Sequence, residues 1–226
     1  PLREVGNQIL SVENLSKSVD GRSLFDKLTF SISKGDKIAF VSKDPSAVTA
    51  FFEIINDKLQ ADAGKFEWGT TITKSYLPVE NTEFFTEELG LMDWLRQFVP
   101  PHITDADEPF LRGFLGKMLF SGDDIQKKTK VLSGGEKVRC MVSRMMLQNP
   151  NVILLDQPTD HLDLESIQSF NEQCTEYKSI VLLSSHDHTF MQTVANRVIE
   201  LTPKGVIDRL MTFDEYLADD RVKALK

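Results

Sequence analysis

Two short apolar runs joined by a helical pattern restrict the possible folds of this chain more than any other feature. Residues 152–155 and 180–183 are uninterrupted runs of Val, Ile and Leu, and residues 164–177 between them have the apolar spacing of a helix. Such a run is typical of a strand that is buried on both faces, as strands are in parallel sheets. Because a helix separates the two strands, the sequence predicts an α/β fold with a covered parallel sheet.

The rest of the chain divides into a β-rich first part and a helical middle part. Strand patterns occur at residues 9–15, 28–32, 38–41, 65–68 and 71–76, with a helical pattern at residues 48–59. From about residue 84 to residue 150 helical patterns dominate, so we expect a helical subdomain inserted between the strands. A chain of 226 residues with 41% hydrophobic content buries one sizeable core rather than two. We therefore predict one domain over residues 9–226, preceded by a linker remnant at residues 1–8.

Composition argues against several classes of protein. The net charge is -8, and no cluster of lysines and arginines provides a footprint for nucleic acid. No window reaches the roughly 18 consecutive apolar residues of a membrane span, and no charged and then apolar leader opens the chain. Cys140 and Cys174 lack metal-type spacing and suit a reducing compartment. These features predict a cytoplasmic protein without a membrane-spanning part.

The segment Leu-Ser-Gly-Gly-Glu at residues 132–136 has the chemistry of an anion site. Ser133 is a good N-cap residue, and a helical pattern follows it directly. Gly134 and Gly135 let backbone amides approach a ligand, and the N-terminus of a helix carries a partial positive charge. The segment therefore predicts a helix whose first turn binds an anion.

Four motifs in this order resemble the ABC ATPase family. Residues 132–136 are similar to the family's signature, the strand ending at Asp156 to its Walker B strand, residues 160–163 to its D-loop and His186 to its switch histidine. The run Asp-Gln-Pro-Thr-Asp-His-Leu-Asp, which ends at Asp163, also resembles the ABC-F group, whose members carry two cassettes on one soluble polypeptide.

This resemblance implies an ABC-type P-loop ATPase fold, with a parallel β core, an antiparallel β layer and an inserted helical signature subdomain. It also implies ATP and Mg²⁺ as cofactors. The implied partners are the N-terminal cassette of the same polypeptide and the ribosome, so the chain would be a second cassette in a protein that acts in translation.

The phosphate loop departs from the pattern of the family. A P-loop reads Gly-x-x-x-x-Gly-Lys-Ser/Thr, because its amides cradle phosphates and its lysine neutralises their oxygens. Residues 42–49 read Ser-Lys-Asp-Pro-Ser-Ala-Val-Thr, so both glycines are absent, Pro45 lacks an amide donor and Val48 replaces the lysine. Thr49 keeps a hydroxyl that can reach Mg²⁺, and Lys43 is an alternative contact for a phosphate. The degenerate loop predicts weak or absent binding of ATP.

Three further positions lack the residue that the resemblance implies. Val19 replaces the aromatic side chain that stacks on adenine, Pro78 replaces the glutamine of the Q-loop, and Gln157 replaces the general-base glutamate. A neutral amide has no useful basicity near neutral pH, so Gln157 can only orient water. Gln157 is either natural or a laboratory substitution, and the neighbouring losses favour a natural residue.

The resemblance also implies that cassettes pair head to tail, with each ATP between the P-loop of one and the signature of the other. The roles of this chain then divide into two groups. The residues expected to act on ATP held by the partner cassette are Ser133, Gly134, Gly135 and Glu136 of the signature and Asp163 of the D-loop. The residues expected at the degenerate site are Lys43, Thr49, Asp156, Gln157 and His186, of which Thr49 and Asp156 are the candidate Mg²⁺ ligands.

Three other functions remain open from the sequence: a nucleotide-binding subunit of a membrane transporter, an assembly scaffold that binds no ATP, and a fully active ATPase. Pro78 argues against the first, because a transporter's coupling helix docks near the Q-loop. The intact signature argues against the second, and Val19, Val48 and Gln157 argue against the third. Two degenerate P-loops facing two signatures lack the ATP that joins cassettes, so we expect the isolated chain to be a monomer.

Overall fold

The computed structural model describes residue 6 and residues 8–225. The predicted linker remnant at residues 1–8 therefore lies outside the described residues, apart from Gly6 and Gln8. Gln8 already begins the first strand, β1 (Gln8–Val19).

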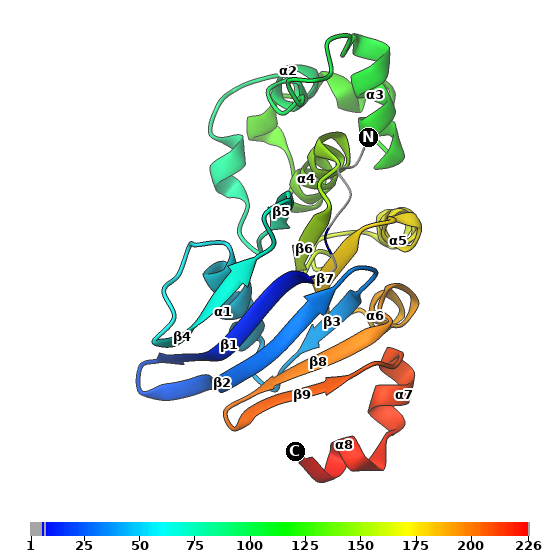
Figure 1. The fold of residues 1–226 in the computed structure, drawn as a ribbon. Coiled ribbons are helices and arrows are strands. Elements are labelled where there is room, and N and C mark those ends of the chain that lie inside the picture. Colours follow the sequence, from blue (N-terminus) through cyan, green and yellow to red (C-terminus); the bar gives the residue numbers. More distant parts are fainter. Residues whose placement is uncertain (1–5, 7, 226) are drawn as a thin grey trace.

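A six-stranded sheet forms the centre of the molecule (Figure 1). Its strands occur in the order β5 (Lys74–Leu77), β6 (Val152–Asp156), β7 (Ile180–Ser184), β3 (Lys37–Val41), β8 (Arg197–Thr202) and β9 (Gly205–Arg209). Neighbouring strands from β5 to β8 are parallel, and β9 is antiparallel to β8. Because β6 and β7 are buried along their whole length, the prediction of a covered parallel sheet is confirmed.

A second sheet of three antiparallel strands lies against the first. It consists of β2 (Arg22–Ser33), β1 and β4 (Ala63–Trp68), in this order. Helix α1 (Pro45–Ile55) packs between this sheet and the central one, where the rings of Phe51 and Phe52 lie 5.2 and 5.5 Å from the ring of Phe40. The expected antiparallel layer is thus present and shares a core with α1.

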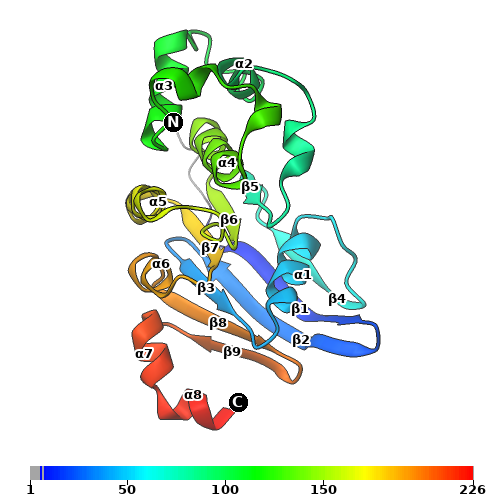
Figure 2. The ribbon, with the colours of Figure 1, turned by 180° about the vertical axis from the view of Figure 1, so that it is seen from behind.

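The two faces of the central sheet serve different cores. Leu154 and Leu182 pack with α1 and the antiparallel sheet, whereas Leu155 and Leu183 pack with helices on the opposite face. These helices are α5 (Leu164–Glu176) and α6 (His188–Val194), and α7 (Phe213–Ala218) and α8 (Asp220–Leu225) follow at the C-terminal end (Figure 2). Side chains alternate between the faces of a strand, so one short apolar run supplies both cores.

Residues 82–150 contain helices and no strand, and they extend away from the sheets (Figure 1). The elements are η1 (Thr82–Phe85), α2 (Leu91–Arg96), α3 (Glu108–Lys117), η2 (Gly122–Gln126), η3 (Thr129–Val131) and α4 (Gly134–Gln148). Phe85 stacks on Trp94 with ring centroids 4.8 Å apart, and both side chains are buried. Within the described part of the chain, no helix has the length and apolarity needed to cross a membrane.

Several predicted boundaries were wrong for identifiable reasons. The first helix begins at Pro45 instead of residue 48, because Asp44 caps it and proline suits the first helical position. It also ends at Ile55 instead of residue 59. Both β1 and β2 are 12 residues long. The part of their hairpin nearest the turn is mostly exposed, so it lacks the apolar alternation by which strands are recognised.

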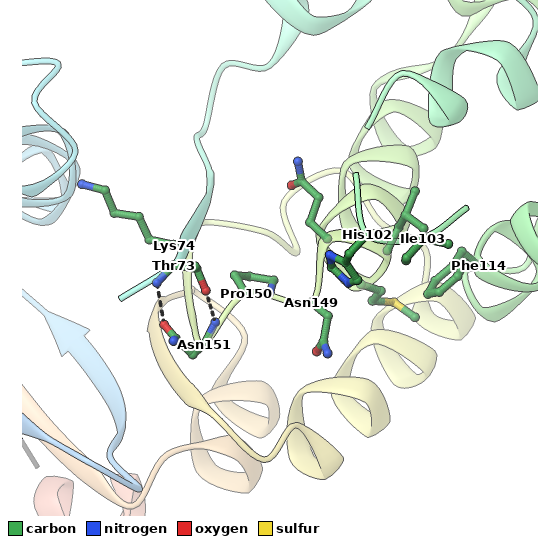
Figure 3. Close-up of a pocket in the computed structure, with 11 residues that line it drawn as sticks. Thr73, Lys74, His102, Ile103, Phe114, Asn149, Pro150 and Asn151 are labelled. Carbon is green, nitrogen blue, oxygen red and sulfur yellow. Dashed lines mark hydrogen bonds between the residues drawn. The ribbon is translucent and has the colours of Figure 1, made fainter. Parts of the chain in front are cut away.

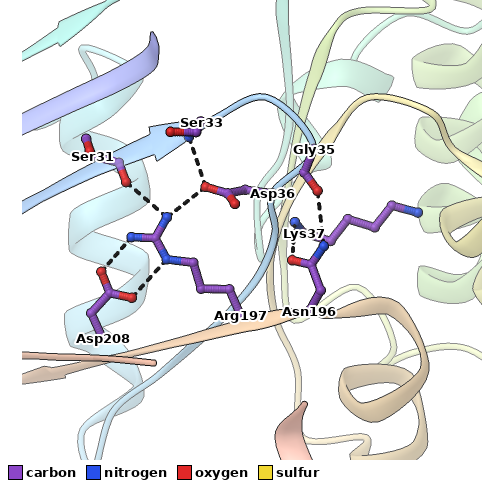
Figure 4. A network of polar contacts seen from close by, with 8 residues as sticks. All are labelled: Ser31, Ser33, Gly35, Asp36, Lys37, Asn196, Arg197 and Asp208. Atoms are coloured by element: carbon purple, nitrogen blue, oxygen red, sulfur yellow. Dashed lines mark hydrogen bonds and ion pairs between the residues drawn. The ribbon is translucent and has the colours of Figure 1, made fainter. Parts of the chain in front are cut away.

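A partly buried arginine joins four segments at one end of the two sheets (Figure 4). Arg197 of β8 donates to Asp36 at 2.7 Å, to both carboxylate oxygens of Asp208 in β9 at 2.8 and 2.5 Å, and to the carbonyl of Ser31 in β2 at 3.0 Å. The Arg197 side chain is only 13% exposed. The partner carboxylates of Asp36 and Asp208 are 13% and 30% exposed, so these ion pairs are partly shielded from water.

Candidate functional site

The N-terminus of α1, where a P-loop would hold phosphate, is occupied by a carboxylate of the chain itself. Asp44 is the N-cap residue, and its Oδ1 accepts hydrogen bonds from the backbone N–H of Ser46 at 3.1 Å and from the Ser46 hydroxyl at 2.7 Å. Its Oδ2 lies 2.6 Å from the guanidinium of Arg22. The Ser46 hydroxyl above all, and also the Arg22 charge, lower the pKa of Asp44. The helix end therefore carries a fixed negative charge.

The other residues of this loop also leave little to bind a phosphate. Ala47 and Val48 lie in the first turn of α1 and are buried in the core, so the lysine position of a P-loop points an apolar side chain inward. Lys43 is exposed and lines a cavity of about 300 Å³ together with Arg22 and Asp44. Because the helix end is capped and the lysine is absent, the residues present do not fit a nucleotide triphosphate at this loop.

Asp156 places a buried carboxylate at the end of β6. It ends β6 with 1% of its surface exposed, and neither of its oxygens has a hydrogen-bond partner among the described residues. Burial raises its pKa to about 6, with a further increase from Glu53. The hydroxyls of Thr49 and Tyr76 lie near enough to favour the charged form, yet neither is placed to form a hydrogen bond with it.

Thr49 and Asp156 fit a Mg²⁺ ion only in part. A hydroxyl and an unpaired carboxylate are hard oxygen donors of the kind that Mg²⁺ prefers. However, in the part of the chain that the structure describes, no group of three or more His, Cys, Asp or Glu side chains is placed to hold a metal. An ion here would need further ligands, such as water or phosphate oxygens.

Gln157 has an unusual backbone and faces β7. Its φ is 48°, in the left-handed region that few residues other than glycine adopt. Its backbone N–H donates to the carbonyl of Ser184 at 2.8 Å, and its side-chain amide donates to the Ser184 hydroxyl at 3.1 Å. The amide oxygen is buried with no partner among the described residues. The side chain is therefore held in place, but it offers no base.

The signature segment forms the predicted capped helix. The Ser133 hydroxyl accepts from the backbone N–H of Glu136 at 3.3 Å, and the Glu136 carboxylate accepts from the backbone N–H of Ser133 at 2.8 Å, which is a capping box. Lys127 pairs with Glu136 at 2.6 Å. Burial tends to raise the pKa of Glu136, but the bonds from Lys127 and Ser133 outweigh it and lower the pKa. Ser133 and Gly134 are exposed, so this helix end is accessible.

The D-loop lies directly against the signature glycines. A Cβ atom added to Gly135 would lie 2.3 Å from the carbonyl oxygen of His161, which is closer than any real contact. At Gly134 the same test gives an ordinary 3.6 Å contact with the His161 ring. Asp163 caps α5 by accepting from the backbone N–H of Ser166 at 2.8 Å, and this bond lowers its pKa. The fold thus places the signature segment (residues 132–136) against the D-loop (residues 160–163).

The remaining candidate positions are scattered around the degenerate site. His186 is exposed beside Asp187, which caps α6. Val19 is 45% exposed. Pro78 directly follows β5 and lines a cavity of about 360 Å³ that also contains Thr49. Pro78 and His186 follow the parallel strands β5 and β7, whereas Val19 ends β1 of the antiparallel sheet, and none of them replaces the missing lysine.

Two participants were missed by sequence reasoning. Asp44 entered the sequence analysis only as part of the run 42–49, and Arg22 did not enter it. The pair Asp44-Pro45 is a common start of a helix, with a capping side chain followed by proline, and this signal could have identified the cap. The ion pair with Arg22 depends on the path of the β1–β2 hairpin, which no local pattern encodes.

A larger cavity lies at the opposite end of the central sheet (Figure 3). Its volume is about 770 Å³, and His102 and Phe114 of the helical region form part of its wall. Asn151 and Thr73 hold its floor together through hydrogen bonds of 2.7 and 3.0 Å. Because Thr73 and Asn151 precede β5 and β6 whereas Asp156 ends β6, this cavity is separate from the phosphate loop.

Comparison with known proteins agrees with this geometry. The sequence profile of the ABC transporter family matches residues 25–160. The chain is 50% identical over 224 residues to the uncharacterized ABC transporter ATP-binding protein YkpA of Bacillus subtilis (strain 168), which covers 99% of this chain and 41% of that protein. It is 28% identical over 223 residues to the energy-dependent translational throttle protein EttA of Escherichia coli (strain K12), covering 96% of this chain and 39% of that protein. The chain thus spans about two fifths of the length of these relatives.

Solved structures share the fold. The ATP-binding subunit of an ABC transporter superimposes with a TM-score of 0.74 at 19% identity, covering 95% of this chain and 94% of that one. A nucleotide-free ATP-binding cassette from an ABC transporter gives a TM-score of 0.73 at 17% identity, covering 96% and 97% of the two chains. At this level of identity the similarity extends to the fold alone.

Proposed function

The chain belongs to the ABC transporter family of ATP-binding cassettes, and from this premise we propose that it supplies the signature half of an ATP site whose phosphate-binding half lies on a partner cassette. Its own P-loop contributes little or nothing to nucleotide binding. The chain would act in trans, by closing over ATP that the partner holds.

The contrast between two helix N-termini carries this proposal. At α1 the first turn is filled by the Asp44 carboxylate, which is paired with Arg22. At α4 the first turn begins with the exposed residues Ser133 and Gly134, and its carboxylate, Glu136, is held in the capping box and paired with Lys127. One end has lost its capacity for a phosphate, and the other retains it.

The chemistry of the α4 N-terminus suits a phosphate. The first amides of a helix have no acceptor within the helix, and their partial positive charge stabilises an anion. A serine hydroxyl that accepts one hydrogen bond can still donate its own proton, so Ser133 can serve both the cap and a phosphate oxygen. Lys127 offsets the charge of Glu136, which lies 2.6 Å away. Such donors would stabilise charge that develops on the γ-phosphate during transfer.

ATP and Mg²⁺ would be bound mainly by the partner cassette. Bound Mg²⁺ would neutralise charge on the phosphates. At the other site of the pair, the degenerate one, Thr49 and Asp156 are the candidate Mg²⁺ ligands of this chain, and Lys43 is the remaining cation of the P-loop. Gln157 would not take a proton from water, and His186 would have no γ-phosphate to sense, so the degenerate site would not hydrolyse ATP.

The biological setting is inferred from relatives. The translational throttle EttA is similar over 96% of this chain, and the Asp-Gln-Pro-Thr-Asp-His-Leu-Asp run resembles the ABC-F group. We infer that the partner is the N-terminal cassette of the same polypeptide, that the protein acts with the ribosome in translation, and that it is cytoplasmic. The chain covers only 39% of EttA, so the activity of a whole protein is proposed here from a part of its length.

A nucleotide-binding subunit of a membrane transporter is the second candidate. It is favoured by the relative YkpA, which is 50% identical to this chain over 224 residues and is described as an ABC transporter ATP-binding protein. Pro78 argues against it, since this residue replaces the Q-loop glutamine beside which a coupling helix docks in the resembling family.

Replacement of Ser133 by arginine tests the proposal in the two-cassette polypeptide. The arginine would fill the open end of α4, so we expect ATP turnover to fall by roughly ten-fold or more, as when one donor to a transition-state oxyanion is lost. Ser121→Arg is the matched control, because Ser121 is exposed in the same helical region and precedes η2. Unchanged turnover in the folded Ser133→Arg protein would contradict the proposed role.

A further inference from the structure

We propose that Asp44 is the residue that excludes phosphate from this P-loop, by acting as a built-in anion. The inference rests on the proposed function, in which this cassette holds no ATP of its own. It adds a cause: the loop is closed to phosphate by a group that is present, and not only because the lysine and glycines are absent.

The contacts of Asp44 are those that a phosphate oxygen would make. Its Oδ1 accepts from the backbone N–H and the hydroxyl of Ser46, at 3.1 and 2.7 Å, in the first turn of α1. Its Oδ2 lies 2.6 Å from the Arg22 guanidinium. Helix amides, a hydroxyl and a guanidinium are the groups that bind phosphates in proteins. Here one carboxylate occupies all three.

The surroundings would otherwise attract an anion. The cavity of about 300 Å³ beside Asp44 is lined by three cationic residues, Arg22, Lys43 and Lys204, and by one further acidic residue, Glu200, which is buried and accepts a hydrogen bond from the Tyr216 hydroxyl. Arg22 is 70% exposed at its side chain and can turn toward a ligand. With Asp44 ionised, Arg22 is already paired and an incoming phosphate meets a negative charge at the helix end. Without that charge, the cations Arg22, Lys43 and Lys204 and the N-terminus of α1 would face the same cavity.

The proposal assigns separate roles to Asp44 and Val48. Val48 is buried and leaves the loop without its lysine, which lowers the affinity for phosphate. Asp44 adds repulsion and occupies the donors, which lowers the affinity further. Replacing Asp44 by asparagine removes the charge and keeps a good N-cap, so α1 should remain folded.

Calorimetric titration with inorganic pyrophosphate and with Mg-ATP tests the proposal on wild-type protein, Asp44→Asn and Asp44→Asn/Arg22→Ala. We expect wild-type protein to give no heat at submillimolar ligand. Asp44→Asn should bind pyrophosphate at least ten-fold more tightly than wild type, and the added Arg22→Ala change should remove most of this gain. Asp107→Asn is the matched control, because Asp107 also caps a helix that has proline in its first turn, and it should behave as wild type.

The outcomes separate this inference from the proposed function. If neither wild type nor folded Asp44→Asn binds pyrophosphate, the role of Asp44 is refuted while the signature role stands. If wild type and Asp44→Asn both bind Mg-ATP with the same micromolar affinity, both ideas fail. A gain that is equal in Asp107→Asn would also refute the proposal, because it would reflect net charge and not the position of Asp44.

Discussion

At the scale of single residues, Asp156 links burial to pH. Its pKa is raised to about 6 in the folded chain, mainly by burial, from an ordinary value of 3.8. Between these two pH values the folded chain keeps a proton on Asp156 that the unfolded chain has released. The free energy of unfolding therefore falls as pH rises from about 4 to about 6, and the whole loss is present above that range. The shift of about two units corresponds to roughly 2 to 3 kcal/mol. Asp156→Asn should raise the melting temperature at pH 7.5 and not near pH 4.

Thermal melts at the two pH values check this prediction. Asp105→Asn is the control, because Asp105 is exposed and the same substitution there should leave the pH profile as in wild type. A gain in stability for Asp156→Asn that is the same at pH 4 and pH 7.5 would show that better packing, and not removal of a charge, is the cause.

At the scale of elements, Arg197 of β8 links β2, β9 and the loop before β3 through hydrogen bonds and ion pairs. Removing it would leave the carboxylates of Asp36 and Asp208 without their charged partner. At present a guanidinium nitrogen of Arg197 lies 2.7 Å from Asp36 and another lies 2.8 Å from Asp208. Breaking a buried ion pair from one side costs about 3 to 5 kcal/mol. Because Arg197 and Asp36 are each 13% exposed and Asp208 is 30% exposed, we expect Arg197→Met to lower the free energy of unfolding by about 3 kcal/mol, the lower end of this range, in urea titrations.

Arg112→Met provides the comparison for this network. Arg112 forms an exposed ion pair with Glu108 one turn away in α3, and such surface pairs contribute about 0.5 kcal/mol or less. If both substitutions had the same small effect, the Arg197 network would not fasten the sheets, and the central strands would depend on apolar packing alone.

At the scale of the whole molecule, the absence of a fitting triphosphate site bears on assembly. Two copies of this chain placed head to tail would bring two signatures against two P-loops that are each capped by Asp44. Nothing would bridge the copies, and the net charge of -8 on each would oppose their approach. Light scattering should therefore give the mass of a monomer with and without Mg-ATP, and a mass that doubles with nucleotide would contradict this expectation.

Sequence patterns were sufficient for features that depend on one segment. The strands β6 and β7 follow from their apolar runs, and the capped start of α4 follows from Ser133 and the glycines. Features made by distant segments could not be predicted in this way. Three features depend on how separate elements are placed in space. They are the Asp44–Arg22 ion pair, the Asp156 carboxylate, which has no hydrogen-bond partner among the described residues, and the cavity that Phe114 and Asn151 line. Burial and pairing are properties of the assembled fold, so local periodicity does not contain them.

The close approach of Gly135 to His161 means that the residues of the signature are constrained for two different reasons. Any side chain at position 135 would collide with the D-loop backbone at 2.3 Å, so folding alone demands glycine there, whether or not the protein handles nucleotide. Position 134 has room for a methyl group, with 3.6 Å to the nearest atom. In related sequences that no longer bind ATP, we expect Gly135 to be conserved and Gly134 and Ser133 to vary. Conservation of Ser133 and Gly134 would then indicate selection for phosphate binding.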